Sequence, residues 1–569
     1  MENSEIADIL TDIVNLLEIK GDNPFRLRAY KNAILVIEEL PYSLETIVEE
    51  ESDKKTLEAI PGIGKGVSEK IHEILKTGSC HTLEELLIEF PAGLLDMLHL
   101  SGMGPKKVKL VFEELGVKSI RGLERAAKAG ALNTLPGMGV KSEEKILKAI
   151  DNYKSIQGSG RFSLPTALSA AVSIIEYLEA SPKVAKAEFA GSLRRFEETI
   201  GDLDILASGK DASAIMERFS SFPSIKEVVV SGETKTTVTL ESGMNVDLRV
   251  VEPKSFGAAL QYFTGSKTHN IALRKRAKKL GLKISEYGVF IEKTGKRVAG
   301  KTEKEVYKAI GLPYIPPEIR LNFGEIEAGE ALKLPQELSL ADIKGDLHMH
   351  TVESDGSGTI KEMAEEAIKR GYEYIAITEH SKATGVANGL DDKRLLKHID
   401  RIDKFNESLK DKKIPFHVLK GAEVDIRADG SLDYPEEILR KLDIRIGAIH
   451  SGFTQSREKM TARVITALSS GLVDILAHPT GRIINIRAPY EIDMEAVIKA
   501  AKESGTAMEL NSYPERLDLK DTHLRLARDM GVLISINTDS HSPEQLDNIS
   551  YGIHTARRAW IEPKDVLNC

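Results

Sequence analysis

Apolar positions in the first part of the chain recur every three or four residues. The first such stripe places six apolar side chains at helical spacing: Ile6, Ile9, Leu10, Ile13, Leu16 and Leu17. Residues 1 to about 155 contain no comparable alternation of apolar and polar positions. The pattern therefore predicts a helical region, which we divide into residues 1–80 and 81–155.

A motif of an apolar residue followed by two spaced glycines occurs three times in this helical region. The three copies read IPGIGKGVSEKI, LSGMGPKKVKLV and LPGMGVKSEEKI. Glycine allows a tight turn and close approach of a phosphate, and the amides that open the next helix face that phosphate. This helix-hairpin-helix pattern predicts binding to the DNA backbone without sequence readout, through Gly62, Gly64, Gly102, Gly104, Gly137 and Gly139. The alternative is a set of plain helical turns that bind no ligand.

The pattern changes after residue 156. The helical segment LPTALSAAVSIIEYLEA precedes five strand-like segments, which read VAKAEFAGS, DLDILA, EVVVSG, KTTVTLE and NVDLRVV. A helix followed by a sheet predicts an α+β domain over residues 156–253. Residues 254–315 follow as a smaller subdomain, and its segment from Lys254 to Lys283 holds eight Lys or Arg and no Asp or Glu. That local basic charge suits DNA phosphates.

Residues 316–340 read as a linker, with prolines near both ends, acidic residues between them and no clear apolar period. Residues 341–569 then alternate short apolar runs with helical stretches. Seven runs read as strands, namely GDLHMHT, YIAITEHS, FHVLKGAEVDI, IRIGAIHS, VDILAHPT, AMELNS and VLISINTDSH. Alternating strands and helices predict parallel strands, and seven of them predict a distorted β/α barrel.

Composition narrows the functional classes. A chain of 569 residues is too long for one core, and its net charge of -9 gives no general attraction to nucleic acid. The two cysteines, Cys80 and Cys569, form no disulfide framework and suit a reducing compartment, so we expect a cytoplasmic protein. We expect neither a signal peptide nor a membrane span. Ten of the 14 histidines follow residue 340, which marks the last domain as chemically different.

The α+β domain contains carboxylates that are placed to bind metal. Asp202 and Asp204 lie two apart on a predicted strand, so their side chains share a face, and Asp247 fits a neighbouring strand. Such carboxylates repel one another unless cations join them, and a divalent metal pair serves phosphoryl transfer. A solvated strand end is the alternative. The upstream run GSLRR, which begins at Gly191, supplies a turn, a hydroxyl and fixed cations for a triphosphate.

A second set of candidate ligands lies at the predicted strand ends of the last domain. The carboxyl ends of barrel strands form one mouth, so these side chains are expected to converge. They are His348, His350, Asp355, His380, Glu423, His450, His478, Asp539 and His541. Nine ligands are too many for one ion, and Glu423 could bridge two. Mixed nitrogen and oxygen ligands favour Zn, Mn or Fe over Mg.

The motifs GSLRR, GDLD, VDLR and YFTGS resemble the nucleotidyltransferase palm and thumb of family X DNA polymerases, and the resemblance covers residues 1–315. It implies two Mg²⁺ ions held by Asp202, Asp204 and Asp247. It also implies a nucleotide site made of Arg161, Gly191, Ser192, Arg195, Gly201, Tyr262, Phe263, Gly265, Asn270 and Arg274. Lys70 aligns with the lysine that gives some of these polymerases lyase activity on abasic sites. A phosphate-binding role is the alternative for Lys70.

The barrel ligand set resembles the trinuclear centre of the PHP (polymerase and histidinol phosphatase) family, which implies up to three Mn²⁺ or Zn²⁺ ions. One departure is Glu379, which precedes His380 where Asp is more usual. The resemblances together predict a DNA polymerase that fills short gaps in repair, such as base excision repair, and acts as a monomer on gapped or nicked DNA with dNTPs. The barrel would be a 3′-5′ exonuclease, with AP endonuclease or 3′-phosphatase activity left open.

Two other functions compete with this interpretation. The first is a small-molecule phosphatase of the histidinol phosphate type, whose front half binds DNA only for regulation. The second is a non-catalytic scaffold that binds DNA ends. The complete palm carboxylates and YFTGS argue against the first, and two full sets of metal ligands argue against the second.

Overall fold

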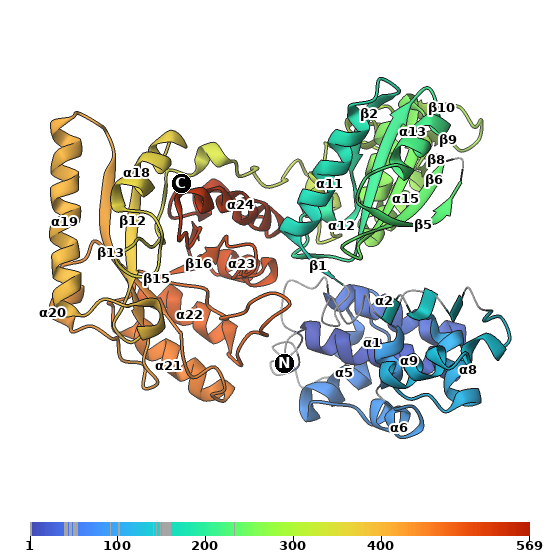
Figure 1. Cartoon of the computed structure of the whole chain (residues 1–569), viewed down its shortest axis with the longest axis horizontal. Helices are drawn as coiled ribbons and strands as arrows, with labels where there is room; N and C mark the ends of the chain where they lie inside the picture. Colours follow the sequence, from blue (N-terminus) through green and yellow to red (C-terminus); the bar gives the residue numbers. More distant parts are fainter. Residues whose placement is uncertain are drawn as a thin grey trace. The chain divides into compact units, whose positions relative to one another are not determined.

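The computed structural model describes residues 3–38, 44, 48, 55–91, 93–98, 100, 103–139, 142–143, 145–147, 149–150, 161–232 and 234–569. The chain divides into two compact units (Figure 1). Unit 1 comprises Met1–Phe162 and Thr239–Asn245, and unit 2 comprises Ser163–Val238 and Val246–Cys569.

Unit 1 is built from helices, as the apolar period predicts. Its described elements are α1 (Asn3–Lys20), α2 (Pro24–Glu38), α4 (Lys55–Glu58), α5 (Lys65–Thr77), α6 (His81–Glu89), α7 (Gly93–Leu98), α8 (Pro105–Leu115), α9 (Ile120–Lys128) and η1 (Leu132–Thr134). The stripe on α1 forms the core, because Ile6, Leu10, Ile13 and Leu16 are fully buried. Ile9 is partly buried against that core.

The α+β domain, the palm, consists of a helix and a five-stranded sheet. Its elements are β1 (Phe162–Ser163), α11 (Leu164–Glu179), β2 (Val184–Phe189), α12 (Gly191–Arg194), β3 (Thr199–Ile200), β4 (Asp202–Gly209), α13 (Ala212–Ser220), β5 (Ile225–Ser231), β6 (Lys235–Leu240) and β7 (Asn245–Val251). The strand order is β2-β4-β7-β6-β5, so β4 and β7 are neighbours. Every second residue of β7 is buried, which is the alternation that its sequence predicts.

The thumb follows the palm. Its elements are η2 (Pro253–Ser255), α14 (Phe256–Thr264), α15 (Lys267–Lys279), β8 (Leu282–Ser285), β9 (Gly288–Ile291), β10 (Arg297–Ala299) and α16 (Glu303–Ala309). Helix α15 begins after Ser266, whose hydroxyl accepts the amide proton of His269 at 3.2 Å. This is an ordinary N-cap, and it fixes the start of the basic helix directly after the YFTGS turn.

The predicted linker at residues 316–340 contains packed structure in its first half. Turn η3 (Pro317–Ile319) and helix α17 (Glu325–Glu330) lie there, and Ile319 and Ile326 belong to the thumb core. Two buried charges of this segment are paired with the thumb: Arg320 with Glu303 at 2.6 Å, and Glu325 with His269 at 2.5 Å. Because charged residues make these contacts, an apolar period could not predict them.

The C-terminal domain contains seven strands in one parallel sheet, in sequence order from β11 to β17. The strands are β11 (Gly345–Asp346), β12 (Tyr374–His380), β13 (His417–Asp425), β14 (Ile444–Ala448), β15 (Ile475–Leu476), β16 (Ala507–Asn511) and β17 (Ile534–Asn537). A parallel bridge between Met349 and Ser540 joins the two edges just beyond β11 and β17. The predicted seven-stranded barrel is therefore confirmed.

Helices and short turns precede, connect and follow the barrel strands (Figure 1). They are η4 (Leu340–Asp342), α18 (Ile360–Lys369), η5 (Gly385–Ala387), α19 (Asp392–Asp411), α20 (Glu436–Leu439), α21 (Arg457–Ser469), α22 (Met494–Ser504), α23 (Asp521–Asp529), η6 (Pro543–Asn548), α24 (Ile549–Arg558) and η7 (Pro563–Asp565). Among the described residues, no helix is both long enough and apolar enough to cross a membrane.

A buried ionic cluster in the thumb predicts a pH dependence of stability. Glu303 is buried, yet Arg320 and Arg194 lower its pKa to about 2, and Arg194 binds it through two bonds of 2.9 and 2.7 Å. Because the folded pKa lies below the unfolded value near 4.3, the pair stabilises the fold fully above that value and loses its effect as pH falls toward 2. Glu303→Gln is expected to destabilise the thumb by about 3 kcal/mol at neutral pH and to flatten this acid dependence.

The single tryptophan offers a local probe, because Trp560 packs against the same thumb core. Urea unfolding followed by its fluorescence between pH 2 and 7 measures both effects. Glu305→Gln, an exposed change on the same helix, is the matched control. If the free energy of unfolding depends on pH in the same way for Glu303→Gln and wild type, the ion pairs of Glu303 are not the source of the acid dependence.

Candidate functional site

All nine candidate ligands of the barrel lie at the carboxyl ends of its strands or in the loops that follow them. His348 and His350 follow β11, His380 ends β12, and Glu423 lies in β13. The remaining five are in the loops after β11, β14, β15 and β17: Asp355, His450, His478, Asp539 and His541. Parallel strands bring these ends to one edge, so the convergence predicted from the sequence follows from the topology.

The Glu423 carboxylate is the centre of this group. It is 1% exposed, and five imidazole rings have a nitrogen within 3.7 Å of its oxygens. They are His380 at 2.7 Å, His478 at 2.8 Å, His450 at 3.2 Å, His348 at 3.6 Å and His350 at 3.7 Å. One carboxylate among so many nitrogen ligands has the position of a group that bridges cations.

Three overlapping sets of side chains have ligand atoms within 4.8 Å of one another. The sets are His350, Asp355, His380 and His541; His348, His350 and Asp539; and His380, Glu423 and His450. Several atoms in them are buried without a hydrogen-bond partner in the described structure, including Nε2 of His348, both ring nitrogens of His350 and Oε2 of Glu423. Buried polar atoms are normally satisfied, so these atoms fit metal ligands.

Electrostatics in the barrel mouth also fit cations. Burial disfavours charged histidine, yet Glu423 and Asp355 raise the pKa of His380 to about 10, and Glu423 and Asp425 raise that of His450 to about 9. Burial, together with the neighbouring His380, lowers the pKa of His350 to about 3. The carboxylates thus hold protons on two rings, and metal binding would release them.

The sequence did not single out Glu509, which holds the His348 ring. Glu509 is fully buried on β16, and one of its oxygens lies 2.7 Å from His348 Nδ1. The other oxygen accepts the backbone amide of His478 at 2.7 Å. A carboxylate behind a histidine orients the opposite nitrogen toward a metal. The acidic residue within the otherwise largely apolar strand segment AMELN is the sequence feature that could have indicated Glu509.

Glu379, the departure from the usual Asp, reaches the loop that carries Asp355. It is fully buried and accepts bonds from the Thr351 amide at 3.2 Å, the Thr351 hydroxyl and the Ser354 hydroxyl. Burial raises its pKa to about 7. The Glu379 side chain therefore holds the loop that carries the candidate ligand Asp355.

In the palm, the structure places Asp202 and Asp204 on β4 and Asp247 on the adjacent β7. Burial raises the pKa of Asp204 to about 6, and Asp202 and Asp247 add to the shift by repulsion. The three carboxylates therefore influence one another, as expected of ligands for shared cations. The Asp247 oxygens are engaged by Lys235 at 2.6 Å and by the Thr237 hydroxyl at 2.5 Å. The palm aspartates are not among the sets within 4.8 Å in the described residues.

The GSLRR segment lies directly against Asp204. Gly191 has a φ of +60°, and a Cβ at this position would come within 2.3 Å of an Asp204 oxygen. Only glycine fits here, because both the backbone conformation and the close approach exclude a side chain. Ser192 is half-buried at the same turn, and Gly201 precedes β4.

The two arginines of GSLRR have different surroundings. Arg194 is bound to Glu303 and to the Thr264 hydroxyl at 2.7 Å, which gives it a structural role. Arg195 donates to the Thr264 carbonyl and pairs with Glu197, and its Nη1 lies 3.1 Å from the position of a Cβ on Gly265. The structure thus brings Arg195 to the YFTGS turn.

The predicted contacts of α14 and α15 are also close together. Tyr262 and Phe263 form an edge-on pair with ring centroids 5.2 Å apart, and Arg249 lies over the Phe263 ring. The Asn270 side chain donates to the Tyr262 carbonyl at 2.7 Å. Arg274, one turn farther, is exposed. Arg161 belongs to unit 1, so its predicted role in the nucleotide site stays a prediction.

The glycine-rich turns open onto helices in the described copies. Gly64 and Gly104 are the N-cap residues of α5 and α8, and neither helix has a side-chain cap there. No atom of the described structure lies within 4 Å of a Cβ built on Gly64, Gly104, Gly137 or Gly139. The amides of the first turns therefore have open space for a phosphate. Gly62 precedes the first of these turns with a φ of +110°, and Gly102 lies outside the described residues.

Lys70 lies on α5 and donates to the Thr82 hydroxyl at 2.7 Å. It is half-buried. This contact is compatible with either a lyase or a phosphate-binding lysine, and both stay predictions.

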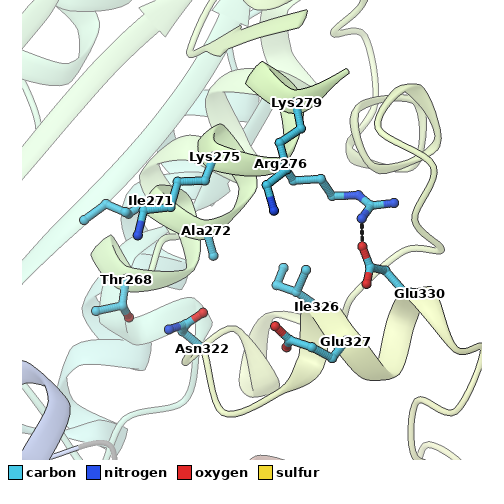
Figure 2. Close-up of a pocket in the computed structure, with 10 residues that line it drawn as sticks. All are labelled: Thr268, Ile271, Ala272, Lys275, Arg276, Lys279, Asn322, Ile326, Glu327 and Glu330. Atoms are coloured by element: carbon cyan, nitrogen blue, oxygen red, sulfur yellow. Dashed lines mark ion pairs between the residues drawn. The ribbon is translucent and has the colours of Figure 1, made fainter. Parts of the chain in front are cut away.

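A cavity of about 400 Å³ lies between α15 and α17 (Figure 2). Its lining is basic on α15 and acidic on α17: Thr268, Ile271, Ala272, Lys275, Arg276, Lys279, Asn322, Ile326, Glu327 and Glu330. Figure 2 shows Arg276 reaching across it to pair with Glu330. Asn270 and Arg274 are not among the lining residues, so this cavity is distinct from the predicted nucleotide contacts.

Four family models match the chain. The family described as "Helix-hairpin-helix domain" matches residues 1–80, and "SAM-like Helix-hairpin-helix tandem" matches residues 94–152. "DNA polymerase beta thumb" matches residues 259–321, which extends into the predicted linker. "PHP domain" matches residues 346–513.

The relatives differ in how much of the chain they cover. "DNA polymerase/3'-5' exonuclease PolX" of Bacillus subtilis (strain 168) is 42% identical over 571 residues, covering 100% of this chain and 97% of that protein. A probable phosphatase of Thermoanaerobacter sp. (strain X514) is 32% identical over 39% of this chain and 89% of its own length. A probable phosphatase of Acetivibrio thermocellus is 34% identical over 34% of this chain and 78% of its own length.

The position of Glu509 behind His348 generates a prediction about metal affinity. Glu509→Gln is expected to weaken metal binding by the barrel about 10- to 100-fold, because the His348 ring loses its charged hydrogen-bond partner. Metal titration of the chelator-treated protein, followed by phosphoester hydrolysis at each metal concentration, measures the change.

Glu515→Gln, which removes an exposed acid in the loop after β16, is the matched control and is expected to behave as wild type. Excess metal is expected to restore hydrolysis to Glu509→Gln. If the metal dependence of Glu509→Gln equals that of the control, Glu509 does not orient a ligand.

Proposed function

The chain belongs to the family X DNA polymerases with a C-terminal PHP domain, and from this premise we propose that it extends DNA in the palm and hydrolyses DNA phosphoesters in the barrel. The observation that carries the proposal is the presence in one chain of two separate groups of candidate metal ligands. One is three carboxylates on neighbouring palm strands, and the other is a set of histidines and carboxylates at the strand ends of the barrel. The palm cluster lies beside the GSLRR and YFTGS segments, and the barrel cluster contains the histidines.

In the palm, we assign Asp202, Asp204 and Asp247 to two Mg²⁺ ions, which would neutralise charge on the attacking and leaving oxygens when bound. Asp247 assists loss of the proton from the primer 3′ hydroxyl. Ser192 and Arg195 hold the triphosphate, and the role of Arg161 remains a prediction from the sequence. The product is DNA extended by one nucleotide, with pyrophosphate released.

The contacts of α14 and α15 support this arrangement of the nucleotide. Tyr262 and Phe263 border the sugar, Asn270 meets the base edge, and Arg274 faces the template strand. The bond from Asn270 to the Tyr262 carbonyl fixes these residues relative to one another before a nucleotide binds. Such preorganisation lowers the cost of binding.

In the barrel, we assign the nine residues around Glu423 to up to three ions of Mn²⁺ or Zn²⁺, which would supply hydroxide at neutral pH when bound. The chain's own residues orient this centre, with Glu509 behind His348 and Glu379 beneath the Asp355 loop. We assign the barrel a 3′-5′ exonuclease activity, and AP endonuclease and 3′-phosphatase activities are further candidates.

The biological role that fits these parts is filling of short gaps in DNA repair, with the hairpins of unit 1 binding the backbone at gap ends. A monomer in the cytoplasm remains our prediction. The small-molecule phosphatase alternative is disfavoured, because the two phosphatase relatives cover 39% and 34% of the chain while the polymerase relative covers 100% of it.

Separating the two activities by mutation tests the proposal. Asp247→Ala is expected to reduce nucleotide addition at least about a hundredfold and to leave 3′ end trimming near wild type, because each centre has its own ligands. His348→Ala with His350→Ala is expected to do the reverse. Single-nucleotide extension and 3′ trimming of the same gapped DNA provide the two readouts.

Each of these variants controls for the other. Hydrolysis that persists in the histidine double variant, or that disappears in Asp247→Ala while extension continues, would place the nuclease chemistry in the palm.

The hairpins generate a separate prediction about salt. Lys65→Ala with Lys106→Ala removes two exposed lysines at the starts of α5 and α8. If these lysines contact phosphates, the slope of log affinity against log salt is expected to fall by about 2. Fluorescence anisotropy with a gapped duplex measures it, and Lys128→Ala on α9 is the control. An unchanged slope would show that these two turns do not bind the backbone.

A further inference from the structure

The loop that carries Arg195 contains a strained residue. Phe196 has a φ of 51°, in the left-handed region that bulky side chains avoid. The loop runs from α12 to β3 and includes Glu197 and Glu198. A strained residue persists only when its surroundings hold it, so the contacts of Phe196 are informative.

Phe196 is held by the barrel. Its ring stacks on His554 of α24, with ring centroids 3.4 Å apart and planes 8° apart. His554 Nδ1 lies 2.8 Å from a carboxylate oxygen of Glu318, which Arg557 also contacts at 3.2 Å. The His554 ring is therefore fixed from its other edge, so it offers Phe196 a rigid face.

Two further contacts join the same loop to the barrel. Arg558, also on α24, donates to the Arg195 carbonyl at 3.0 Å and is itself paired with Asp521 at 2.9 Å. Glu198 receives two bonds from Arg482, at 2.5 and 3.0 Å. A four-residue loop is thus held by the barrel through a ring stack, a backbone hydrogen bond and a two-bond ion pair.

The residue between these contacts is the one assigned to the triphosphate. The side chain of Arg195 points to the Thr264 carbonyl at the YFTGS turn, while its backbone carbonyl is held by Arg558. Movement of α24 away from the loop would release the backbone of Arg195 and let Phe196 relax. The direction of the Arg195 guanidinium therefore depends on residues of the barrel.

We propose that the barrel is a positioning element of the polymerase nucleotide site, in which His554, Arg558 and Arg482 hold the loop of Arg195 in the geometry that binds a triphosphate. This inference rests on the role of Arg195 in the proposed function. His554 and Arg482 touch no reacting group of the palm, so they act through the loop. His554 therefore has a proposed role that does not involve metal binding.

The test measures KM for dNTP and kcat in single-nucleotide gap filling with the full-length protein. His554→Ala and Phe196→Ala are each expected to raise KM about three- to tenfold with a smaller change in kcat. The double variant is expected to have a KM no higher than that of the single variant with the larger defect, because residues in contact are coupled and their effects do not add.

His554→Phe keeps an aromatic face and is expected to restore most of the affinity for dNTP. His417→Ala, which removes an exposed histidine on β13, is the matched control.

Two measurements distinguish a positioning role of His554 from a general loss of folding in the variant. The exonuclease rate is expected to be unchanged in His554→Ala, since His554 is not among the metal ligands. Glu198→Gln weakens the loop contact without changing α24 and is expected to raise KM in the same direction. An unchanged KM in both His554→Ala and Glu198→Gln, or additive effects in the double variant, would overturn the inference.

Arg195→Ala distinguishes this failure from failure of the proposed function. If Arg195→Ala raises KM while His554→Ala does not, the nucleotide site stands and its dependence on the barrel is wrong. If Arg195→Ala leaves KM unchanged, the role of Arg195 itself is wrong, and the inference that rests on it falls as well.

Discussion

The structure brings acidic side chains close together at two places, where repulsion or the loss of hydration opposes their clustering unless a cation joins them. In the barrel, Glu423 is buried among five imidazole rings, and in the palm, burial and two neighbouring aspartates raise the pKa of Asp204 to about 6. In the palm, repulsion from the neighbouring aspartates and burial both disfavour the charged Asp204, and in the barrel, burial disfavours the charged Glu423. The clustering of such side chains on neighbouring palm strands and at the strand ends of the barrel is what identifies the two candidate sites.

Strand topology supplies each cluster in a different way. In the palm, a spacing of two on β4 and the adjacency of β7 bring three carboxylates to one face. In the barrel, parallel strands bring together candidate ligands that are far apart in sequence, from His348 to His541. Glu509 then supports the barrel site directly, since one of its oxygens contacts the ring of His348 and the other accepts the backbone amide of His478.

The sequence predicted most of the fold and the side chains that the structure brings together. Helical stripes, the glycine repeat and the seven strand-like runs lie where the patterns indicated, because each reflects local periodicity. The sequence did not predict the packing of residues 317–330, where buried ion pairs such as Arg320 with Glu303 replace an apolar period. It also missed Glu509 and the contact of Phe196 with His554, because such partners are far apart in sequence and follow no motif.

Anomalous diffraction from crystals of the protein purified without added metal tests the central claim most directly. The account predicts peaks at the Mn or Zn absorption edge among the nine barrel residues, with Glu423 between two of them. It predicts no peak between Asp202, Asp204 and Asp247 until Mn²⁺ is supplied in place of Mg²⁺, when peaks appear there as well. A barrel mouth that binds neither Mn nor Zn, or a palm that takes up no divalent ion at any concentration, would contradict it.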